Sequence, residues 1–260
     1  LHGRKSGGDR LLEINKIYNM DCLEGIKYID DKSIDLIVTD PPYLMNYKSN
    51  RRVKQEKFDY IMNDVNSEEM ISKYIEECYR ILKNNTAIYL FCSWHNIDFF
   101  KREVEKYFKL KNLIVWNKNN HGSGDLKGAY APKHELVLFG HKGRSLFREK
   151  RIPDVIDFPK VPSNHLLHPT EKPIGLLELF IRNSSDELDI VFDGFMGSAS
   201  TAIASINTNR KYIGFELDPT YYAIANERIS KVESTVVKNE KPQEKAEDKY
   251  NWLDELLEVI

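Results

Sequence analysis

Residues 191–201 read Val191-Phe192-Asp193-Gly194-Phe195-Met196-Gly197-Ser198-Ala199-Ser200-Thr201 and contain one complete unit of an α/β fold. The apolar start is typical of a buried strand, the two glycines mark a tight turn, and the small residues after them can open a helix. The spacing differs from the dinucleotide-binding fingerprint, whose third glycine is missing here. The stretch predicts a parallel α/β sheet in which this turn either approaches a ligand closely or is a plain strand-to-helix connection.

The same alternation of strand and helix extends over most of the chain. Short runs rich in β-branched and aromatic residues, several of them nearly all apolar, fit strands that are covered on both faces. These candidate strands lie at 17–20, 34–39, 87–92, 112–116, 135–139, 189–192 and 212–216. Helical patterns lie between them at 67–82, with Ser67 as the N-cap, and at 96–108, 173–183, 200–207 and 219–232. We therefore expect a Rossmann-like, doubly wound and largely parallel sheet of seven strands.

Length and composition limit the class of protein. The 260 residues, of which 41% are hydrophobic and 30% charged, are enough for one α/β domain with a closed core. No apolar run approaches the roughly 18 residues of a membrane span, and no secretory signal pattern is present, so we expect a cytoplasmic protein without a membrane partner. The three cysteines, Cys22, Cys78 and Cys92, lack metal-ligand spacing, which favours a reducing compartment and no metal site.

Three parts are expected along the chain: a flexible arm over 1–13, one α/β domain over 14–233, and a charged tail over 234–260. Within the tail, apolar residues at helical spacing predict a short terminal helix, which would dock on the domain or on a second subunit: Trp252, Leu253, Leu256, Leu257 and Ile260.

Three segments of the domain are long loops, at 44–66, 117–132 and 140–167, and loops of this length in a compact domain usually carry function. The net charge of −2 gives no indication of nucleic-acid binding, but basic residues gather in two of the loops. They are candidates for contacts with phosphates, with solvated loops as the alternative: Lys48, Arg51, Arg52, Lys54 and Lys57, then Lys142, Arg144, Arg148, Lys150 and Arg151.

The segment Asp40-Pro41-Pro42-Tyr43 directly follows the predicted strand 34–39. In open parallel sheets, ligands bind beyond the carboxyl ends of strands. Two consecutive prolines fix the backbone and remove two N–H donors, so carbonyl oxygens are left without donors between them. An acidic side chain, a carbonyl and an aromatic ring would then grip a planar ring that carries an amino group. The alternative is a strand that ends in a proline turn.

Three further features stand at strand ends or helix starts. Glu216 ends a predicted strand about 20 residues past the glycine turn, where Rossmann-type folds bind ribose hydroxyls. His168-Pro169-Thr170-Glu171-Lys172-Pro173 precedes a helix, and Asp21-Cys22 follows the first strand. A lone His or Lys near a helix start is usually structural, and an acidic helix cap is the favoured interpretation of Asp21 when it is considered alone.

Taken together, the motifs resemble those of the amino-methyltransferases. Residues 40–43 resemble the catalytic D-P-P-Y, residues 193–201 the D-P-F-x-G-S-G-T-T cofactor loop, and residues 168–173 the H-P-T-x-K-P segment. The catalytic segment precedes the cofactor loop, which resembles the circularly permuted motif order of the β group of DNA amino-methyltransferases. The resemblance covers roughly 16–229. It departs from the family at three small residues: Gly194 replaces the usual Pro, Ala199 a Gly and Ser200 a Thr.

This resemblance implies a site-specific DNA methyltransferase that uses S-adenosylmethionine and acts on the exocyclic amine of a flipped adenine. The acid-led motif usually accompanies adenine in this family, and cytosine-specific DNA methylation or RNA adenine methylation stays open. The implied catalytic residues are Asp40, Pro41, Pro42 and Tyr43. The implied cofactor-binding residues are Asp21, Cys22, Asp40, His168, Thr170, Lys172, Asp193, Phe195, Gly197, Ser198 and Glu216. Among them, Glu216 would hold the ribose, Asp21 and Cys22 would meet the adenine of the cofactor, and His168, Thr170 and Lys172 would cradle its methionine end.

The amine of adenine is a poor nucleophile because its lone pair is delocalised into the ring. Asp40 and the Pro41 carbonyl would accept hydrogen bonds from its two N–H groups. Asp40 would also face the positive charge that develops on nitrogen. Tyr43 would stack on the flipped base. The segments 44–66 and 140–167 would contact DNA, double-stranded or single-stranded. A homodimer and a cognate restriction endonuclease are further partners that the sequence leaves open, and a bacterial, archaeal or phage origin fits the resemblance.

Overall fold

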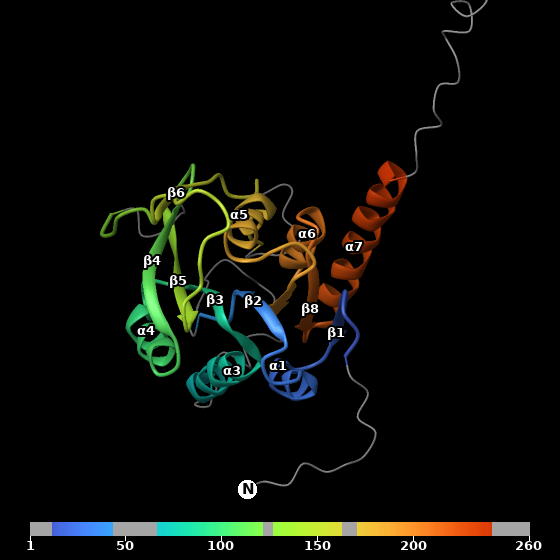
Figure 1. The fold of residues 1–260 in the computed structure, drawn as a ribbon. Coiled ribbons are helices and arrows are strands. Elements are labelled where there is room, and N and C mark those ends of the chain that lie inside the picture. The colour runs from blue at the N-terminus through green and yellow to red at the C-terminus, as the bar shows by residue number, and fades with distance from the viewer. Residues whose placement is uncertain (1–11, 44–66, 122–126, 163–170, 241–260) are drawn as a thin grey trace, which may run out of the picture.

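A computed structural model describes residues 12–43, 67–121, 127–162 and 171–240, and an eight-stranded sheet runs through its centre (Figure 1). The strand order is β1-β8-β7-β2-β3-β5-β4-β6. Strand β5 is antiparallel to both β3 and β4, and the other neighbouring pairs are parallel. The strands are β1 (Lys16–Asn19), β2 (Ile34–Thr39), β3 (Leu82–Cys92), β4 (Lys109–Asn117), β5 (His134–Lys142), β6 (Val155–Asp157), β7 (Ile190–Asp193) and β8 (Lys211–Glu216).

This sheet confirms the predicted doubly wound α/β fold and corrects the strand number. The seven predicted strands are present, and β6 is the eighth. It lies inside 140–167, which was predicted to be a loop, and pairs with the edge strand β4 over only three residues. A strand this short, with an exposed-intermediate-exposed burial pattern, carries too weak an alternation to stand out in the sequence.

Helices cover both faces of the sheet. Figure 1 shows α1, α3 and α4 on one face and α5, α6 and α7 on the other. The helices are α1 (Cys22–Gly25), continued by the 3-10 turn η1 (Ile26–Tyr28), α3 (Ser67–Ile81), α4 (Ile97–Glu105), α5 (Ile174–Ser184), α6 (Ser200–Asn207) and α7 (Pro219–Glu240). Two predicted ends need correction. Ser67 is the first helical residue rather than the N-cap, and α7 continues past Val232, so residues 234–240 of the predicted tail are helical.

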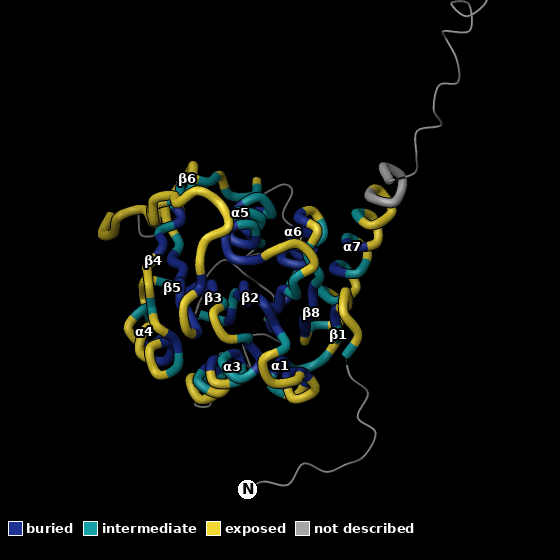
Figure 2. The backbone as a smooth tube through the Cα atoms, in the orientation of Figure 1, coloured by how far each residue is buried: buried dark blue, intermediate teal, exposed yellow. Residues whose placement is uncertain are grey.

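Alternation along the central strands explains the two cores. Side chains at successive strand positions point to opposite faces, and each face buries its own apolar cluster. Figure 2 shows buried residues along the central strands. In β3, Ile88, Leu90 and Cys92 pack with α3 and α4, whereas Ala87, Tyr89 and Phe91 pack with α5. Each large apolar side chain buried in this way contributes about 1.5–3 kcal/mol of transfer free energy. The described ranges contain no helix that is long and apolar enough to span a membrane.

The topology sets the place for a ligand. Strand β2 pairs with β7 on one side and with β3 on the other. The chain leaves β2 toward β3 and leaves β7 toward β8, so the connections diverge between β2 and β7. Such a switch point opens a crevice at the carboxyl ends of the strands. Asp40 follows β2 at this edge, Asp193 ends β7, and Glu216 ends β8.

Candidate active site

Asp40 follows the last residue of β2 and is mostly buried, with 19% of its side chain exposed. Its Oδ2 accepts a hydrogen bond from Lys172 Nζ at 2.5 Å. Its Oδ1 is buried and has no hydrogen-bond partner among the described residues. Leaving a buried acceptor unpaired costs about 1–3 kcal/mol. The position therefore favours a ligand that brings an N–H donor to Oδ1. Burial raises the pKa of Asp40, although the ion pair with Lys172 opposes it.

Lys172 lies between two carboxylates. Its Nζ is 2.5 Å from Asp40 Oδ2 and 3.3 Å from Glu135 Oε2, and only 6% of its side chain is exposed. Burial would lower the pKa of Lys172, but Asp40 and Glu135 outweigh burial and hold the pKa above its usual value. Lys118 pairs with the other oxygen of Glu135 at 2.7 Å. Two cations thus balance two carboxylates in the site.

Tyr43 packs beside this charged group. Its hydroxyl donates to Glu135 Oε2 at 3.4 Å, and its carbonyl accepts a hydrogen bond from the Asn96 side chain. The Lys172 ammonium lies 5.5 Å from the centre of the Tyr43 ring. Pro41 and Pro42 have trans peptide bonds and contribute carbonyls without N–H donors. The segment therefore presents acceptors and an aromatic ring at the switch point.

The turn between β7 and α6 is held from within by Asp193. Its Oδ1 accepts hydrogen bonds from Thr39 Oγ1 at 2.9 Å and from the Phe195 amide at 3.0 Å, and its Oδ2 accepts from Thr201 Oγ1 at 2.8 Å. Burial raises the pKa of Asp193 to about 6. The sequence resemblance assigned Asp193 to cofactor binding. In the structure its carboxylate fixes the shape of the loop and ties it to the end of β2.

Two glycines of this turn have distinct structural reasons. A Cβ on Gly194 would lie 2.5 Å from the ring of Tyr74, and the Gly194 amide donates to the Tyr74 hydroxyl at 3.1 Å. The proline usual in the family could not make this hydrogen bond. Gly197 has a φ of 53°, and its amide donates to Glu216 Oε2 at 2.7 Å. The backbone of the turn therefore packs closely on Tyr74 and donates a hydrogen bond to each of Tyr74 and Glu216.

Glu216 accepts a second amide hydrogen bond, from Asp218 to Oε1 at 2.8 Å. Burial raises its pKa. A carboxylate oxygen can accept more than one hydrogen bond. Glu216 therefore shapes the turn and retains lone pairs for ligand hydroxyl groups. At the start of α6, Ser200 Oγ is buried and has no hydrogen-bond partner in the described parts of the chain.

Arg228 of α7 joins two loops that are far apart in the sequence. Its guanidinium donates to the Ser198 carbonyl at 2.6 Å and to Ser198 Oγ at 2.8 Å, and it pairs with Glu171 at 2.8 Å. The segment that contains Lys172 is thereby held against the glycine turn. Sequence motifs give no indication of Arg228, Glu135 or Lys118, because Arg228 lies on α7, Glu135 on β5 and Lys118 just after β4, all outside the motifs.

The remaining predicted residues are placed as follows. Asp21 is the N-cap of α1, and its Oδ1 accepts from the amides of Leu23 and Glu24, as its structural alternative predicts. Cys22 is buried, and burial raises the pKa of its thiol. His168 and Thr170 lie outside the described residues, as does the basic cluster within 44–66.

The second basic cluster is only partly available for phosphates. Lys142 lies buried in β5 and donates to the carbonyls of Tyr79 at 2.5 Å and Leu82 at 2.7 Å. Arg148 pairs with Asp186 at 3.0 Å. The expectation that Lys142 faces phosphates is therefore wrong, because it is buried and its charge is used within the fold, whereas Arg148 is exposed and its contact with phosphates stays a prediction. Arg144, Lys150 and Arg151 are exposed.

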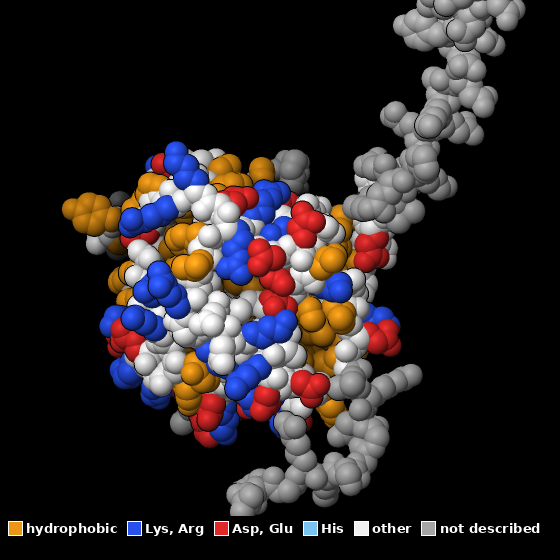
Figure 3. All heavy atoms as spheres, in the orientation of Figure 1, with side chains coloured by type: hydrophobic (Ala, Val, Ile, Leu, Met, Phe, Trp, Pro, Cys, Tyr) orange, Lys and Arg blue, Asp and Glu red, His pale blue; other side chains and the backbone are white. Residues whose placement is uncertain are grey.

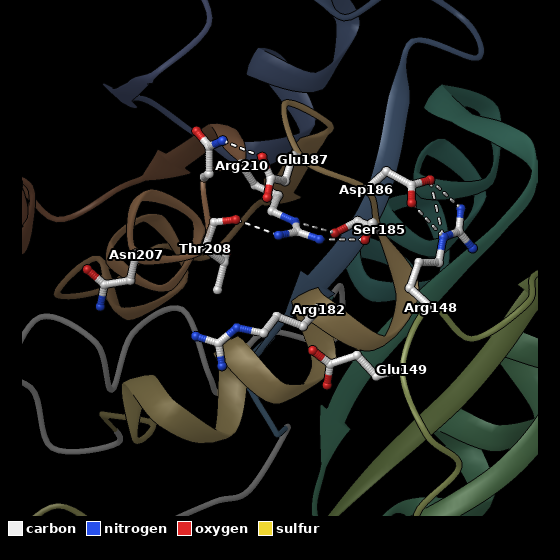
Figure 4. Close-up of a pocket in the computed structure, with 10 residues that line it drawn as sticks. Arg148, Glu149, Arg182, Ser185, Asp186, Glu187, Asn207, Thr208 and Arg210 are labelled. Carbon is white, nitrogen blue, oxygen red and sulfur yellow. Dashed lines mark hydrogen bonds and ion pairs between the residues drawn. The ribbon is translucent and has the colours of Figure 1, made fainter.

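A cavity of about 480 Å³ lies at the opposite edge of the sheet, near the starts of β7 and β8 (Figure 4). Charged side chains of both signs gather on the face shown in Figure 3. Within the cavity, Arg210 donates to Ser185 and Thr208 carbonyls at the ends of α5 and α6, and Arg148 pairs with Asp186. Arg210 thus stabilises the ends of two helices, and the cavity is separate from the carboxyl edge that carries Asp40.

A parallel sheet that carries an antiparallel strand, with an acid-Pro-Pro-aromatic segment at its switch point, defines the class of α/β methyltransferases. The sequence pattern of the N6/N4 DNA methylase family matches residues 34–227, and the chain belongs to that family. It is 29% identical over 251 residues to the DNA adenine methyltransferase YhdJ of Escherichia coli, covering 84% of this chain and 83% of YhdJ. It is 28% identical over 247 residues to the type II methyltransferase M2.MboI of Moraxella bovis, covering 86% and 90%.

Solved structures agree with this assignment. The M1.HpyAVI–SAM complex superposes with a TM-score of 0.65 at 26% identity, covering 82% of this chain and 98% of that protein. The PvuII DNA methyltransferase, described as cytosine-N4-specific, superposes with a TM-score of 0.64 at 19% identity, covering 85% and 92%. The chain is thus a DNA amino-methyltransferase of the N6-adenine or N4-cytosine kind.

Proposed function

We propose that this protein transfers a methyl group from S-adenosylmethionine to the exocyclic N6 amine of an adenine flipped out of DNA. The observation that carries the proposal is the state of Asp40. It stands at the switch point of the sheet, and one of its carboxylate oxygens is buried with no hydrogen-bond donor in the part of the chain that the structure describes. An amino group supplies such a donor, and a carboxylate stabilises the positive charge that develops when the amine is alkylated.

Each residue of the catalytic segment has a task in this proposal. Asp40 Oδ1 and the Pro41 carbonyl accept hydrogen bonds from the two amine hydrogens, which favours a pyramidal nitrogen with a localised lone pair. Tyr43 stacks on the face of the flipped base. After transfer, the alkylated nitrogen releases a proton, and the buried Asp40 is an acceptor with a raised pKa. Holding base and donor in line supplies a further part of the acceleration.

The residues of the neighbouring loops fit S-adenosylmethionine, which supplies a methyl group activated on a sulfonium. Glu216 retains lone pairs for ribose hydroxyls, and Ser200 Oγ, which has no hydrogen-bond partner among the described residues, lies at the start of α6 beside the turn. Gly197 and Ser198 line the turn, and Arg228 fixes its position. Asp21 and Cys22 are proposed for the cofactor adenine, and His168 and Thr170 for its methionine end. Lys172, which the resemblance also assigns to the methionine end, pairs in the structure with Asp40 and Glu135.

Adenine is favoured over cytosine as the acceptor. The family includes both kinds of enzyme, but the motif here begins with Asp, the form that accompanies adenine, and YhdJ is described as a DNA adenine methyltransferase. The exposed stretch from Leu146 to Pro162 is proposed to contact DNA around the target. Trp94, which is 56% exposed just beyond the end of β3, is a second candidate for that surface.

The test is to identify the methylated base directly. The purified protein is incubated with unmethylated bacterial DNA and methyl-labelled S-adenosylmethionine, and the DNA is hydrolysed to nucleosides for mass spectrometry. We expect labelled N6-methyldeoxyadenosine, and none with the Asp40→Ala variant. Labelled N4-methyldeoxycytidine would instead establish the cytosine alternative. Label found only in a parallel reaction with RNA would move the enzyme to RNA adenine methylation.

A further inference from the structure

Glu135 is a buried acid of the site to which no motif assigns a role. It lies on β5, the antiparallel strand, and is contributed by neither β2 nor β7. Its carboxylate pairs with Lys118 at 2.7 Å and with Lys172 at 3.3 Å, and accepts from the Tyr43 hydroxyl at 3.4 Å. Burial acts to raise the pKa of Glu135, but the two lysines outweigh it and hold the pKa below its usual value. Glu135 is thus kept ionised.

The position of Lys172 creates a conflict with the proposed chemistry. Its ammonium donates to Asp40 Oδ2 at 2.5 Å. A positive charge at that distance neutralises the carboxylate that must stabilise a cationic nitrogen in the transition state. It also competes with the amine for the same acid. A second carboxylate that can hold the ammonium would remove the conflict, and Glu135 is within 3.3 Å of it.

We propose that Glu135 is a positioning residue that takes the Lys172 ammonium from Asp40 when the target amine enters. The proposal rests on the methyl-transfer function proposed above. In the resting site Lys172 pairs mainly with Asp40. With the amine bound, Lys172 pairs mainly with Glu135, and Asp40 faces the developing charge with its full negative charge. A small rotation of the lysine side chain achieves the exchange, because both carboxylates already lie near the same nitrogen.

Lys118 sets how strongly Glu135 can hold the second cation. Lys118 pairs with Oε1 of Glu135, whereas Lys172 pairs with Oε2, so Lys118 partly neutralises the carboxylate that Lys172 also contacts. Removing Lys118 should therefore strengthen the hold of Glu135 on Lys172, whereas removing the charge of Glu135 should lock Lys172 on Asp40. The two changes are expected to shift the pKa of Asp40 in opposite directions. The charged and titratable groups that influence Asp40 are Lys172, Glu135, Tyr43, Cys92 and Asp193.

The experiment compares the full-length protein with Glu135→Gln and Lys118→Met, and uses Glu105→Gln, an exposed change on α4, as the matched control. The pKa of Asp40 is followed by carbon-13 NMR of labelled aspartate, which needs no turnover. Losing a neighbouring negative charge lowers the pKa of a carboxyl group, and losing a positive charge raises it. We expect Glu135→Gln to lower the pKa of Asp40 and Lys118→Met to raise it, each by roughly half a unit or more. An unchanged pKa in both variants would overturn the proposal.

Single-turnover methyl transfer at several pH values then tests the exchange itself. We expect Glu135→Gln to slow transfer roughly tenfold at neutral pH, to move the acid limb of the rate profile to lower pH, and to leave the cofactor Kd within about twofold. In a Lys172→Met background the Glu135→Gln change should have no further effect, because no ammonium remains to be taken. Equal slowing in both backgrounds would mean that Glu135 only supports the fold. Absence of transfer by the unaltered protein would contradict the proposed function, while the NMR titration would still decide the role of Glu135.

Discussion

The two halves of the site are built in different ways. On the cofactor side, the carboxylates of Asp193 and Glu216 accept hydrogen bonds from backbone amides and hydroxyl groups, and each of their oxygens has a partner. On the catalytic side, Asp40 and Glu135 share Lys172 through ion pairs, Glu135 also pairs with Lys118, and one oxygen of Asp40 is unpaired among the described residues. A network of short, fully paired hydrogen bonds fixes a shape, whereas exchangeable ion pairs can rearrange. The side proposed for the cofactor is therefore preorganised, and the proposed exchange of Lys172 between Asp40 and Glu135 belongs to the other side.

The largest effect is expected from a substitution that disrupts the catalytic side alone. Asp40→Ala should reduce methyl transfer by about a thousandfold or more, because it removes both the acceptor for the amine and the charge that stabilises the transition state. The cofactor Kd should change by only a few fold, since the loop bonds of Asp193 and Glu216 stay in place. Radiolabel transfer to DNA and calorimetric titration with S-adenosylmethionine measure the two quantities. Turnover close to that of the unaltered protein would contradict the proposed mechanism.

The next largest effect is expected from a substitution that disrupts the cofactor side. Asp193→Ala leaves two hydroxyl groups and one amide without their acceptor in the interior, which should lower the free energy of unfolding by about 3 kcal/mol and weaken cofactor binding. Because burial raises the pKa of Asp193 to about 6, the stability that its titration contributes is fully present below the usual carboxyl pKa. That contribution is lost as the pH rises through about 6.

Urea denaturation of Asp193→Ala and the unaltered protein at pH 4 and at pH 7 therefore checks the size of the loss in unfolding free energy and the direction in which that loss changes with pH. The difference in unfolding free energy between the two proteins should be larger at pH 4. A difference that grows toward pH 7 would show that Asp193 is stabilised in its charged form, contrary to its buried setting. Asp193→Asn, which keeps one acceptor, is the matched variant and should lose less.

Sequence motifs anticipated the cofactor side better than the catalytic side, for a physical reason. The glycine turn and Glu216 can be predicted from short stretches of sequence, because a strand, the turn after it and the next helix are neighbours along the chain. The motif at 168–173 contains Lys172, the ion-pair partner of Asp40, but the other charged residues of the network lie elsewhere in the chain: Glu135 on β5 and Lys118 just after β4. Only the order of strands places β5 and β4 on the far side of β3 from β2, and a single sequence does not contain that order. Tyr74, on α3 and far along the chain from Gly194, was missed for the same reason.

A smaller effect separates stacking from hydrogen bonding at Tyr43. Stacking of an aromatic ring on a base contributes about 1–3 kcal/mol. Tyr43→Ala should therefore lower kcat/KM for DNA by roughly 5- to 150-fold. Tyr43→Phe keeps the ring, loses the hydroxyl interactions with Glu135 and Asp40, and should retain more activity than Tyr43→Ala. Steady-state kinetics with DNA as the varied substrate measures this, and equal activity of the Ala and Phe variants would argue against stacking.

The smallest effect sharpens the description of the cofactor side as preorganised. Ala199 precedes α6 with φ 69° and ψ 29°, a left-handed conformation that costs a residue with a Cβ about 1–2 kcal/mol. The family usually has glycine at this position, and glycine adopts this conformation without that cost. Ala199→Gly should therefore raise the free energy of unfolding by up to about 1 kcal/mol, because the greater freedom of glycine in the unfolded chain offsets part of the gain. Urea denaturation measures the change, with Ala202→Gly inside α6 as a control that should destabilise by about 1 kcal/mol. Destabilisation by both changes would mean that the turn tolerates the alanine without strain and that its shape is fixed by the hydrogen bonds of Asp193 and Glu216 alone.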